Sequence, residues 1–194
     1  MNTAPHHRVQ TIVGSPLGDL RLVASTNGLA GLWFVQRQRH EPPAERLASW
    51  STVAAHPVLD AAKRQLDEYF CGRRQRFDLP LDLEQGTSFQ RAVWQALLEI
   101  PAGATTSYGA LAASLGRPQA MRAVGAAVGR NPMSIVVPCH RVVGGSGSLT
   151  GYAGGLDRKR ALLELEGALI NKTHQWPERT SSTLQPASRP LPAH

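Results

Sequence analysis

The residues best suited to chemistry stand together in the segment Pro138-Cys139-His140-Arg141-Val142. A cysteine attacks as its thiolate, and its pKa falls beside a cation, a histidine or a helix N-terminus. Neighbouring side chains on a strand point in opposite directions. His140 would therefore reach the sulfur of Cys139 only through a turn imposed by Pro138, or through a bridging water. A buried, inert cysteine is the competing interpretation.

Glu166 is the acid that could join this pair. It stands at the C-terminal end of a predicted helix that Asp157 caps and Gly167 follows, where the helix dipole disfavours a carboxylate by about 0.3–1 kcal/mol. A carboxylate there could accept the second imidazole N–H of His140, fix its tautomer and complete a Cys-His-Glu relay. The alternative is a solvated glutamate.

The stretch that would position this segment is predicted to form three helices, over residues 88–99, 107–115 and 118–129. Thr87 and Gln90 have the spacing of a capping box ahead of the first helix. The other two helices are short and joined through Gly116 and Pro118, which is the pattern of a helix-turn-helix. The β-branched runs 135–137 and 141–143, with the glycine-rich stretch 144–147, predict a hairpin and a flexible tip that suit a wing.

The third of these helices is made almost entirely of small residues, and Arg122 and Arg130 are its only charges. A glycine inside a helix costs about 1 kcal/mol relative to alanine, so Gly125 needs a reason. One reason is close approach of the backbone to a narrow groove, with Arg122 projecting into it. Tight packing between helices is the other, and the sequence does not separate them.

Residues 1–84 predict a small α+β scaffold without obvious chemistry. The elements expected are strands over residues 8–13, 19–24 and 29–35, a helix over 58–70 and an extended arm over 77–84. Asn27-Gly28 signals a tight hairpin, and the stretch around Pro42-Pro43 is expected to be a loop. Residues 85–171 form the second block, and residues 172–194 are expected to be a disordered tail.

The composition and charge of the chain limit the classes of protein to which it could belong. The chain of 194 residues has a net charge of +7 and a pI of about 10.2. Residues 85–171 hold eight basic and four acidic side chains, which favours nucleic acid as a partner, although an uneven scatter of solvated arginines is the alternative. No run approaches the roughly 18 apolar residues of a membrane span, no signal peptide is evident, and two cysteines cannot form a disulfide framework. We expect a cytoplasmic protein without membrane contact.

With its surroundings, the Pro-Cys-His-Arg-Val element resembles the O6-alkylguanine-DNA alkyltransferases, the methylated-DNA–protein-cysteine methyltransferases. The resemblance runs from residue 89 to residue 167 and rests on the following motifs: Val93-Trp94, Ile100-Pro101, Ser107-Tyr108-Gly109, Arg122-Ala123-Val124-Gly125, Asn131-Pro132, Pro138 to Val142, Gly151-Tyr152-Ala153-Gly154-Gly155 and Glu166-Gly167. Residues 8–83 resemble, more loosely, the small ribonuclease-H-like N-terminal domain of that family.

The resemblance implies a fold and a reaction. A ribonuclease-H-like domain would precede a winged helix-turn-helix that binds the minor groove of double-stranded DNA. The alkyl group of O6-alkylguanine, or less well of O4-alkylthymine, would pass once to the cysteine after base flipping, without a cofactor. We expect a monomer in solution, and clustering on DNA is left open.

The resemblance also implies residue roles. Cys139 matches the nucleophile, His140 the residue that takes its proton through a water, and Glu166 the carboxylate that orients His140. Asn131 matches the asparagine that braces the turn beneath the cysteine. Tyr108 matches the tyrosine whose hydroxyl helps to neutralise charge on the departing guanine.

For DNA contacts, Arg122 matches the finger that fills the vacated stack, with Ala123, Gly125 and Arg130 beside it. The base pocket is expected to be lined by Tyr108, Val142, Tyr152, Ala153, Gly154 and Gly155. Position 153 is alanine where some family members have serine, so only its backbone N–H could contact the guanine O6.

Some relatives hold zinc in the N-terminal domain, but this sequence predicts no metal site. The candidate ligands lack ligand spacing; they are Cys71, His6, His7, His40 and His56.

Two other classes of function compete with alkyl transfer. One is a DNA-binding module without transfer activity, against which Cys139 argues. The other is a thiol hydrolase, which would leave the helix-turn-helix and Arg122 unexplained.

Overall fold

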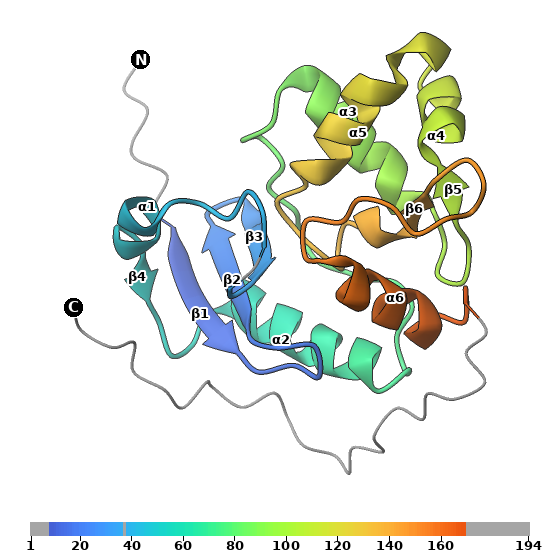
Figure 1. The fold of residues 1–194 in the computed structure, drawn as a ribbon. Helices are drawn as coiled ribbons and strands as arrows, with labels where there is room; N and C mark the ends of the chain where they lie inside the picture. Colours follow the sequence, from blue (N-terminus) through green and yellow to red (C-terminus); the bar gives the residue numbers. More distant parts are fainter. Residues whose placement is uncertain (1–7, 37, 170–194) are drawn as a thin grey trace.

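The computed structural model describes residues 8–36 and 38–169, and over these the chain forms two parts (Figure 1). The N-terminal part, residues 8–83, is a sheet with helices. The C-terminal part, residues 88–169, is mainly helical. This confirms the α+β class. The expected tail over residues 172–194, as well as His6 and His7, lies outside the described residues.

The N-terminal sheet has the strand order β3-β2-β1-β4. Its strands are β1 (Val9–Val13), β2 (Leu20–Ser25), β3 (Gly28–Phe34) and β4 (Ser51–Thr52). The first three are antiparallel neighbours, as predicted, and β4 is a short parallel addition to β1. The hairpin at Asn27-Gly28 is confirmed. Gly28 has a φ of 139°, and a Cβ there would lie 2.3 Å from the carbonyl oxygen of Pro80, so the turn requires glycine.

Two helices accompany the sheet. Helix α2 (Pro57–Phe70) lies across one face of the sheet (Figure 1) and buries its apolar stripe there, as its spacing predicts. The loop expected around Pro42-Pro43 is partly wrong, because Pro43 caps the five-residue helix α1 (Ala44–Ala48). Residues 77–84 form the predicted extended arm. The arm lies beside β3, where Leu29 N donates to Pro80 O at 2.8 Å.

The C-terminal part begins with α3 (Ser88–Leu98), and the capping box between Thr87 and Gln90 is present. Helix α4 (Tyr108–Ser114) follows, with Ser107 accepting from the backbone N–H of Ala110 as its N-cap. The turn after α4 leads into a 3-10 segment (Pro118–Ala120) and then α5 (Met121–Gly129). The α-helical turns of α5 thus begin three residues after the predicted start at Pro118.

The predicted hairpin between residues 135–137 and 141–143 is wrong. Only Val142–Val143 is a strand, β6, and it pairs in parallel with β5 (Thr106–Ser107). Residues 135–137 cannot extend into a strand because Ile135 has a φ of 71° and Cys139–Arg141 forms a 3-10 turn. Residues 144–147, the predicted flexible tip, form a loop directly after β6.

The last helix of the described chain, α6 (Leu156–Leu165), lies between α2 and the other C-terminal helices in Figure 1. The prediction that Asp157 caps this helix is wrong. Gly155 is its N-cap with a φ of 94°, and Asp157 stands within the first turn. Its C-cap is Glu166, as the sequence indicated.

One apolar core runs through both parts of the molecule. A single cluster of buried side chains includes Leu32 and Leu66 of the N-terminal part together with Val137 and Leu162 of the C-terminal part. Backbone bonds also cross between them, because Leu32 N donates to Pro132 O and Ser134 N donates to Leu32 O, both at 2.9 Å. Strand β3 therefore holds the segment that leads to Cys139. Among the described residues, no helix is long and apolar enough to cross a membrane.

The capping box makes a testable contribution to this architecture. Thr87→Ala removes the side-chain acceptor for Gln90 N, so we expect the free energy of unfolding to fall by about 1 kcal/mol. Denaturant unfolding measures the change. The neighbouring exposed serine provides the control, Ser88→Ala, which should change stability much less. Equal midpoints for Thr87→Ala and wild type would contradict a stabilising cap.

Candidate active site

The thiol of Cys139 is buried, and a side-chain hydrogen bond from Asn131 holds it in place. The residue is 4% exposed and begins the 3-10 turn that Arg141 N closes by donating to Pro138 O at 3.0 Å. Asn131 Nδ2 donates to Cys139 Sγ at 3.0 Å and to Val137 O at 2.7 Å. The amide of Asn131 thus fixes both the sulfur and the backbone that leads to it. A turn imposed by Pro138 was one of the two alternatives that the sequence offered, and Pro138 is the N-cap of this 3-10 turn.

His140 is completely buried, and its two ring nitrogens have different surroundings. Nε2 lies 2.9 Å from Glu166 Oε1, whereas Nδ1 has no hydrogen-bond partner among the described residues. An ionised carboxylate can only accept, so Nε2 carries the proton in the neutral ring. Nδ1 is then left with a free lone pair, which is what a base needs. Burial lowers the pKa of His140 despite the opposing effect of Glu166, so the ring rests neutral.

The carboxylate of Glu166 is 2% exposed and is surrounded by donors. Its Oε2 accepts from Arg141 Nε at 2.8 Å. Its Oε1 accepts from Arg141 Nη2 at 2.8 Å and from Tyr69 Oη at 2.8 Å, in addition to His140. Burial alone would raise the pKa of Glu166, but the hydrogen bonds from His140 and Arg141 outweigh it and lower this pKa to about 2.

Cys139 itself rests as a neutral thiol. Burial raises its pKa to about 11, and the hydrogen bond from Asn131 and the charge of Lys159 only partly offset this. A neighbouring histidine can lower the pKa of a cysteine, but desolvation is the larger effect here. To act as a nucleophile, a thiol with so high a pKa would need a base to take its proton.

Lys159 is a member of the site that the sequence did not reveal. It is fully buried on α6, and its Nζ donates to Val142 O at 2.5 Å and Thr150 O at 2.6 Å. The ammonium group thereby fixes β6 against the loop that follows it. Burial lowers the pKa of Lys159 to about 8. In the sequence this lysine stands between Arg158 and Arg160, where it is indistinguishable from a solvated cation.

A cavity of about 140 Å³ opens above the thiol. It is lined by Arg39, His40, Tyr108, Gly125, Val128, Gly129, Cys139, Gly151, Tyr152 and Ala153. Three predicted pocket residues, Tyr108, Tyr152 and Ala153, are therefore brought to the cysteine. Val142 is buried within β6, Gly154 packs against Phe34, and Gly155 is the N-cap of α6, so these three lie outside the cavity wall.

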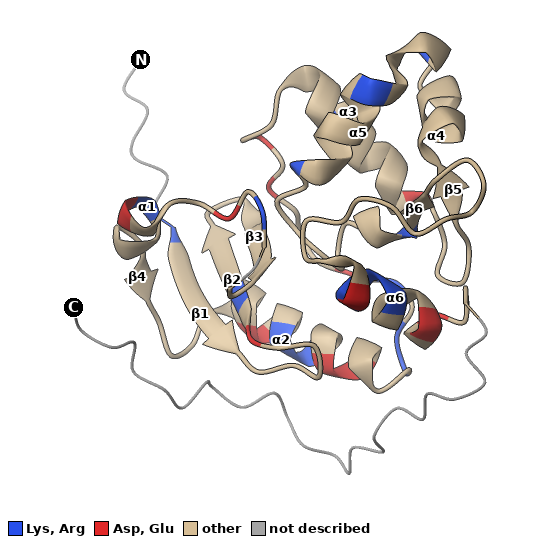
Figure 2. Ribbon diagram, in the orientation of Figure 1, with Lys and Arg blue, Asp and Glu red and all other residues tan. Residues whose placement is uncertain are grey.

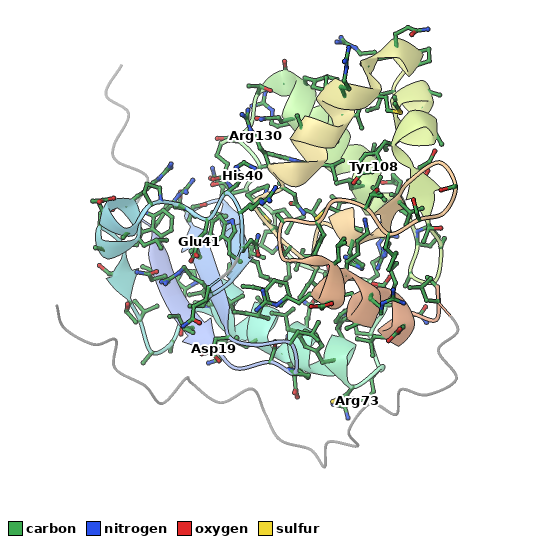
Figure 3. All side chains as sticks on the ribbon, viewed as in Figure 1. Asp19, His40, Glu41, Arg73, Tyr108 and Arg130 are labelled. Carbon is green, nitrogen blue, oxygen red and sulfur yellow. The ribbon has the colours of Figure 1, made fainter. Side chains whose placement is uncertain are left out.

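Helix α5 forms one wall of the cavity. A Cβ on Gly125 would lie 3.8 Å from the ring of Tyr108, which Figure 3 labels. This is an ordinary van der Waals distance, so α5 packs beside that ring and the contact would also admit an alanine. On the outer side, Arg122, Ala123 and Arg130 are exposed. Figure 2 shows blue but no red on α5, where Arg122 stands, and α4 carries no charged residue, so this helix pair presents positive charge without acidic neighbours on the same helices.

The N-terminal part also reaches the cavity, which the sequence did not indicate. Arg39 N donates to Ala153 O at 3.0 Å, and His40 lines the same cavity as Gly129. Figure 3 shows His40 on the edge of the N-terminal part that faces α5. His40 has a φ of 64°, which marks a sharp bend in this loop. No local signal distinguishes these residues from an ordinary loop.

Among the described residues, no group of three His, Cys, Asp or Glu side chains is arranged to hold a metal ion. Cys71 lies at the C-cap of α2 and is half-buried. It is not part of the cavity wall.

The fold and the site define a DNA-binding protein that carries a buried thiol. A family model for the ribonuclease-like domain of 6-O-methylguanine DNA methyltransferase matches residues 9–83, and one for the DNA binding domain of the same protein matches residues 88–168. The chain belongs to the 6-O-methylguanine DNA methyltransferase family, as its motifs indicated.

Individual relatives and solved structures support membership of the same family. The methylated-DNA–protein-cysteine methyltransferase of Mycobacterium bovis is 48% identical over 161 residues, which is 83% of this chain and 92% of that protein. The Methanosarcina barkeri protein of the same name is 47% identical over 156 residues, or 80% of this chain and 94% of its own. The crystal structure of Mycobacterium tuberculosis OGT in complex with DNA has a TM-score of 0.73 and 45% identity, and covers 82% of this chain and 93% of that chain.

The hydrogen bonds that Glu166 accepts from Tyr69, His140 and Arg141 predict that the stability of the fold depends on pH. A carboxyl whose pKa is lower in the folded than in the unfolded chain adds stability above its ordinary value of 4.5, and this is lost as the pH falls toward about 2. Glu166→Gln leaves Arg141 buried without its charge partner, so we expect it to cost about 3 kcal/mol near pH 7. The difference from wild type should shrink below pH 4.5.

Denaturant unfolding between pH 7 and pH 3 measures this difference. Glu84→Gln, at an exposed glutamate, is the control and should follow wild type at every pH. A constant difference between Glu166→Gln and wild type across the range would contradict a carboxylate stabilised by these donors.

Proposed function

We propose that this chain repairs DNA by moving the alkyl group of O6-alkylguanine, and less well of O4-alkylthymine, onto Cys139. The observation that carries the proposal is the position of the thiol, which lines a cavity whose wall is helix α5 of the helix-turn-helix. The names of the relatives agree with this reaction. A thiol hydrolase would not require a cavity built against a basic DNA-binding helix.

The polar groups of the site would carry out alkyl transfer in the following steps. As Cys139 Sγ attacks the methyl carbon in line, its proton passes through a water to Nδ1 of His140, which has the free lone pair. The bond between that carbon and O6 breaks, and the electron pair stays on the guanine. The base takes up a proton from water and leaves as guanine, the imidazolium of His140 returns its proton to water, and Cys139 becomes an S-methylcysteine.

We assign to Tyr108 the stabilisation of charge on the leaving base, because its side chain lines the cavity beside Cys139. Its hydroxyl lies 3.4 Å from Thr150 O and 3.3 Å from Gly151 O, at the rim of the cavity. Burial, together with the proximity of Cys139, raises the pKa of Tyr108, so the phenol remains a protonated donor. Donors aimed at developing charge stabilise a transition state in a site that excludes water.

The depth of the thiol requires the base to leave the helix. Cys139 is 4% exposed, so it cannot reach a base stacked within a duplex. Flipping costs a few kcal/mol, and less for a mispaired base, which contributes selectivity for damage. We propose that α5 enters the minor groove with its small residues close to the backbone, and that the exposed Arg122 fills the vacated stack.

The reaction is expected to occur once per molecule. A thioether is a poor leaving group, and the chain has one other cysteine, Cys71, which lies at the end of α2 outside the cavity. The described residues around Cys139 include no second thiol that could regenerate it. We therefore propose a stoichiometric repair protein that ends as an S-alkyl product.

Peptide mapping by mass spectrometry tests the acceptor. After incubation with duplex DNA that carries one O6-methylguanine, we expect one methyl group on the Cys139 peptide, saturating at one per protein. Cys139→Ala should bind the DNA and take up no methyl group. The other cysteine is the matched control, and Cys71→Ala should be methylated like wild type. DNA binding without any change in mass would contradict alkyl transfer and indicate a lesion-binding module.

The finger role predicts a dependence on the form of the substrate. Arg122→Ala should slow repair of duplex DNA at least tenfold, because the flipped state loses the side chain that replaces the base. Repair of free O6-methylguanine should change less than twofold, since no stack is vacated. Arg64→Ala removes the same charge from the exposed surface of α2 and serves as the control. Equal losses on both substrates would contradict the finger role.

A further inference from the structure

A residue of the N-terminal part contacts the proposed relay directly. Tyr69 stands near the end of α2, is 2% exposed, and donates from its hydroxyl to Glu166 Oε1 at 2.8 Å. The two residues are 97 positions apart in the chain. Glu166 Oε1 is also the oxygen that faces His140 Nε2, so Tyr69 and His140 share one acceptor atom.

The hydroxyl of Tyr69 is a dedicated donor. Its ring packs against Phe70 and Phe77, each with a centroid distance of 5.4 Å, and the hydrogen bond to Glu166 Oε1 sets the direction of the O–H. Burial, followed by the charge and the hydrogen bond of Glu166, raises the pKa of Tyr69 well above its ordinary value. The phenol therefore stays protonated and keeps donating to Glu166 over the whole working range of pH.

We infer that Tyr69 is a positioning residue for alkyl transfer, through which the N-terminal part sets the orientation and the basicity of the carboxylate that holds His140. This inference rests on the proposed function, because it assigns Tyr69 to the relay that deprotonates Cys139. It gives the N-terminal part a role in the chemistry in addition to its packing against the C-terminal part.

The direction of the effect follows from the shared oxygen. A hydrogen bond from Tyr69 withdraws charge from Glu166 Oε1 and makes the carboxylate less basic. A less basic carboxylate holds the imidazolium form of His140 less strongly, which keeps the ring neutral to lower pH. Loss of the hydroxyl should make Glu166 more basic, raise the pKa of His140 and leave less of the free base at acidic pH.

The other charged and titratable groups around His140 remain unchanged in this comparison. Glu166 and Lys159 face it from α6, and Arg141 and Cys139 adjoin it in the 3-10 turn. From the cavity loop, Tyr152 contacts it edge-on with ring centroids 6.5 Å apart. A shift on loss of the Tyr69 hydroxyl would therefore report the Tyr69–Glu166 hydrogen bond.

The test compares Tyr69→Phe with wild type in two measurements. The first is the rate of methylation of Cys139 against pH, where we expect the acid limb to move to higher pH. On that limb Tyr69→Phe should be about tenfold slower than wild type, and on the alkaline plateau within about twofold. The second is an NMR titration of the His140 ring in the protein alone, which should move in the same direction.

Phe77→Leu is the matched control, since it removes a ring neighbour of Tyr69 and leaves the hydroxyl in place. It should lower stability without moving either pH midpoint. Replacement of Tyr69 by 3-fluorotyrosine keeps the shape of the side chain and strengthens the donor. The pKa of His140 should then fall, which provides a test of opposite sign if Tyr69→Phe does not fold.

The outcomes separate this inference from the proposed function. If wild type methylates Cys139 and both midpoints are the same in Tyr69→Phe, the positioning role is overturned while alkyl transfer stands. If wild type takes up no methyl group, alkyl transfer fails, and the titration of His140 still decides whether Tyr69 acts on the ring. Unchanged titrations with both phenylalanine and 3-fluorotyrosine would overturn the role outright.

Discussion

A single buried negative charge organises the site. The carboxylate of Glu166 is withdrawn from water, and such a charge is costly unless it is paired and fully hydrogen-bonded. Its donors come from two places in the fold, Tyr69 on α2 and the adjacent pair His140 and Arg141 in the 3-10 turn. Satisfying this one group therefore fixes α6, α2 and the cysteine-bearing turn with respect to one another.

The same requirement explains why the N-terminal part belongs to the site. Strand β3 holds the segment before Cys139 through backbone bonds at Leu32, and Arg39 holds the cavity loop through Ala153. One apolar core continues beneath these contacts. The thiol is thus buried and neutral, and among the described residues the nearby buried polar atoms without a hydrogen-bond partner are Nδ1 of His140 and the hydroxyl of Tyr152.

The parts of the fold that depend on neighbouring residues could be predicted from the sequence. The parts that depend on contacts between distant segments could not. The capping box at Thr87 and the turn at Asn27-Gly28 depend on neighbouring residues, so the sequence alone indicated them. The hairpin after residue 134 failed because the side chain of Asn131 bonds the carbonyl of Val137, which a strand would have paired elsewhere. Tyr69 carries no local signal, since its partner Glu166 lies 97 residues away.

We propose that Glu166 holds the proton of neutral His140 on Nε2 and leaves Nδ1 as the base for Cys139. Nitrogen-15 NMR of the His140 ring at neutral pH measures this most directly, because it distinguishes the two tautomers from the imidazolium ion. We expect a neutral ring that is protonated at Nε2. A ring protonated at Nδ1, or charged at neutral pH, would contradict it.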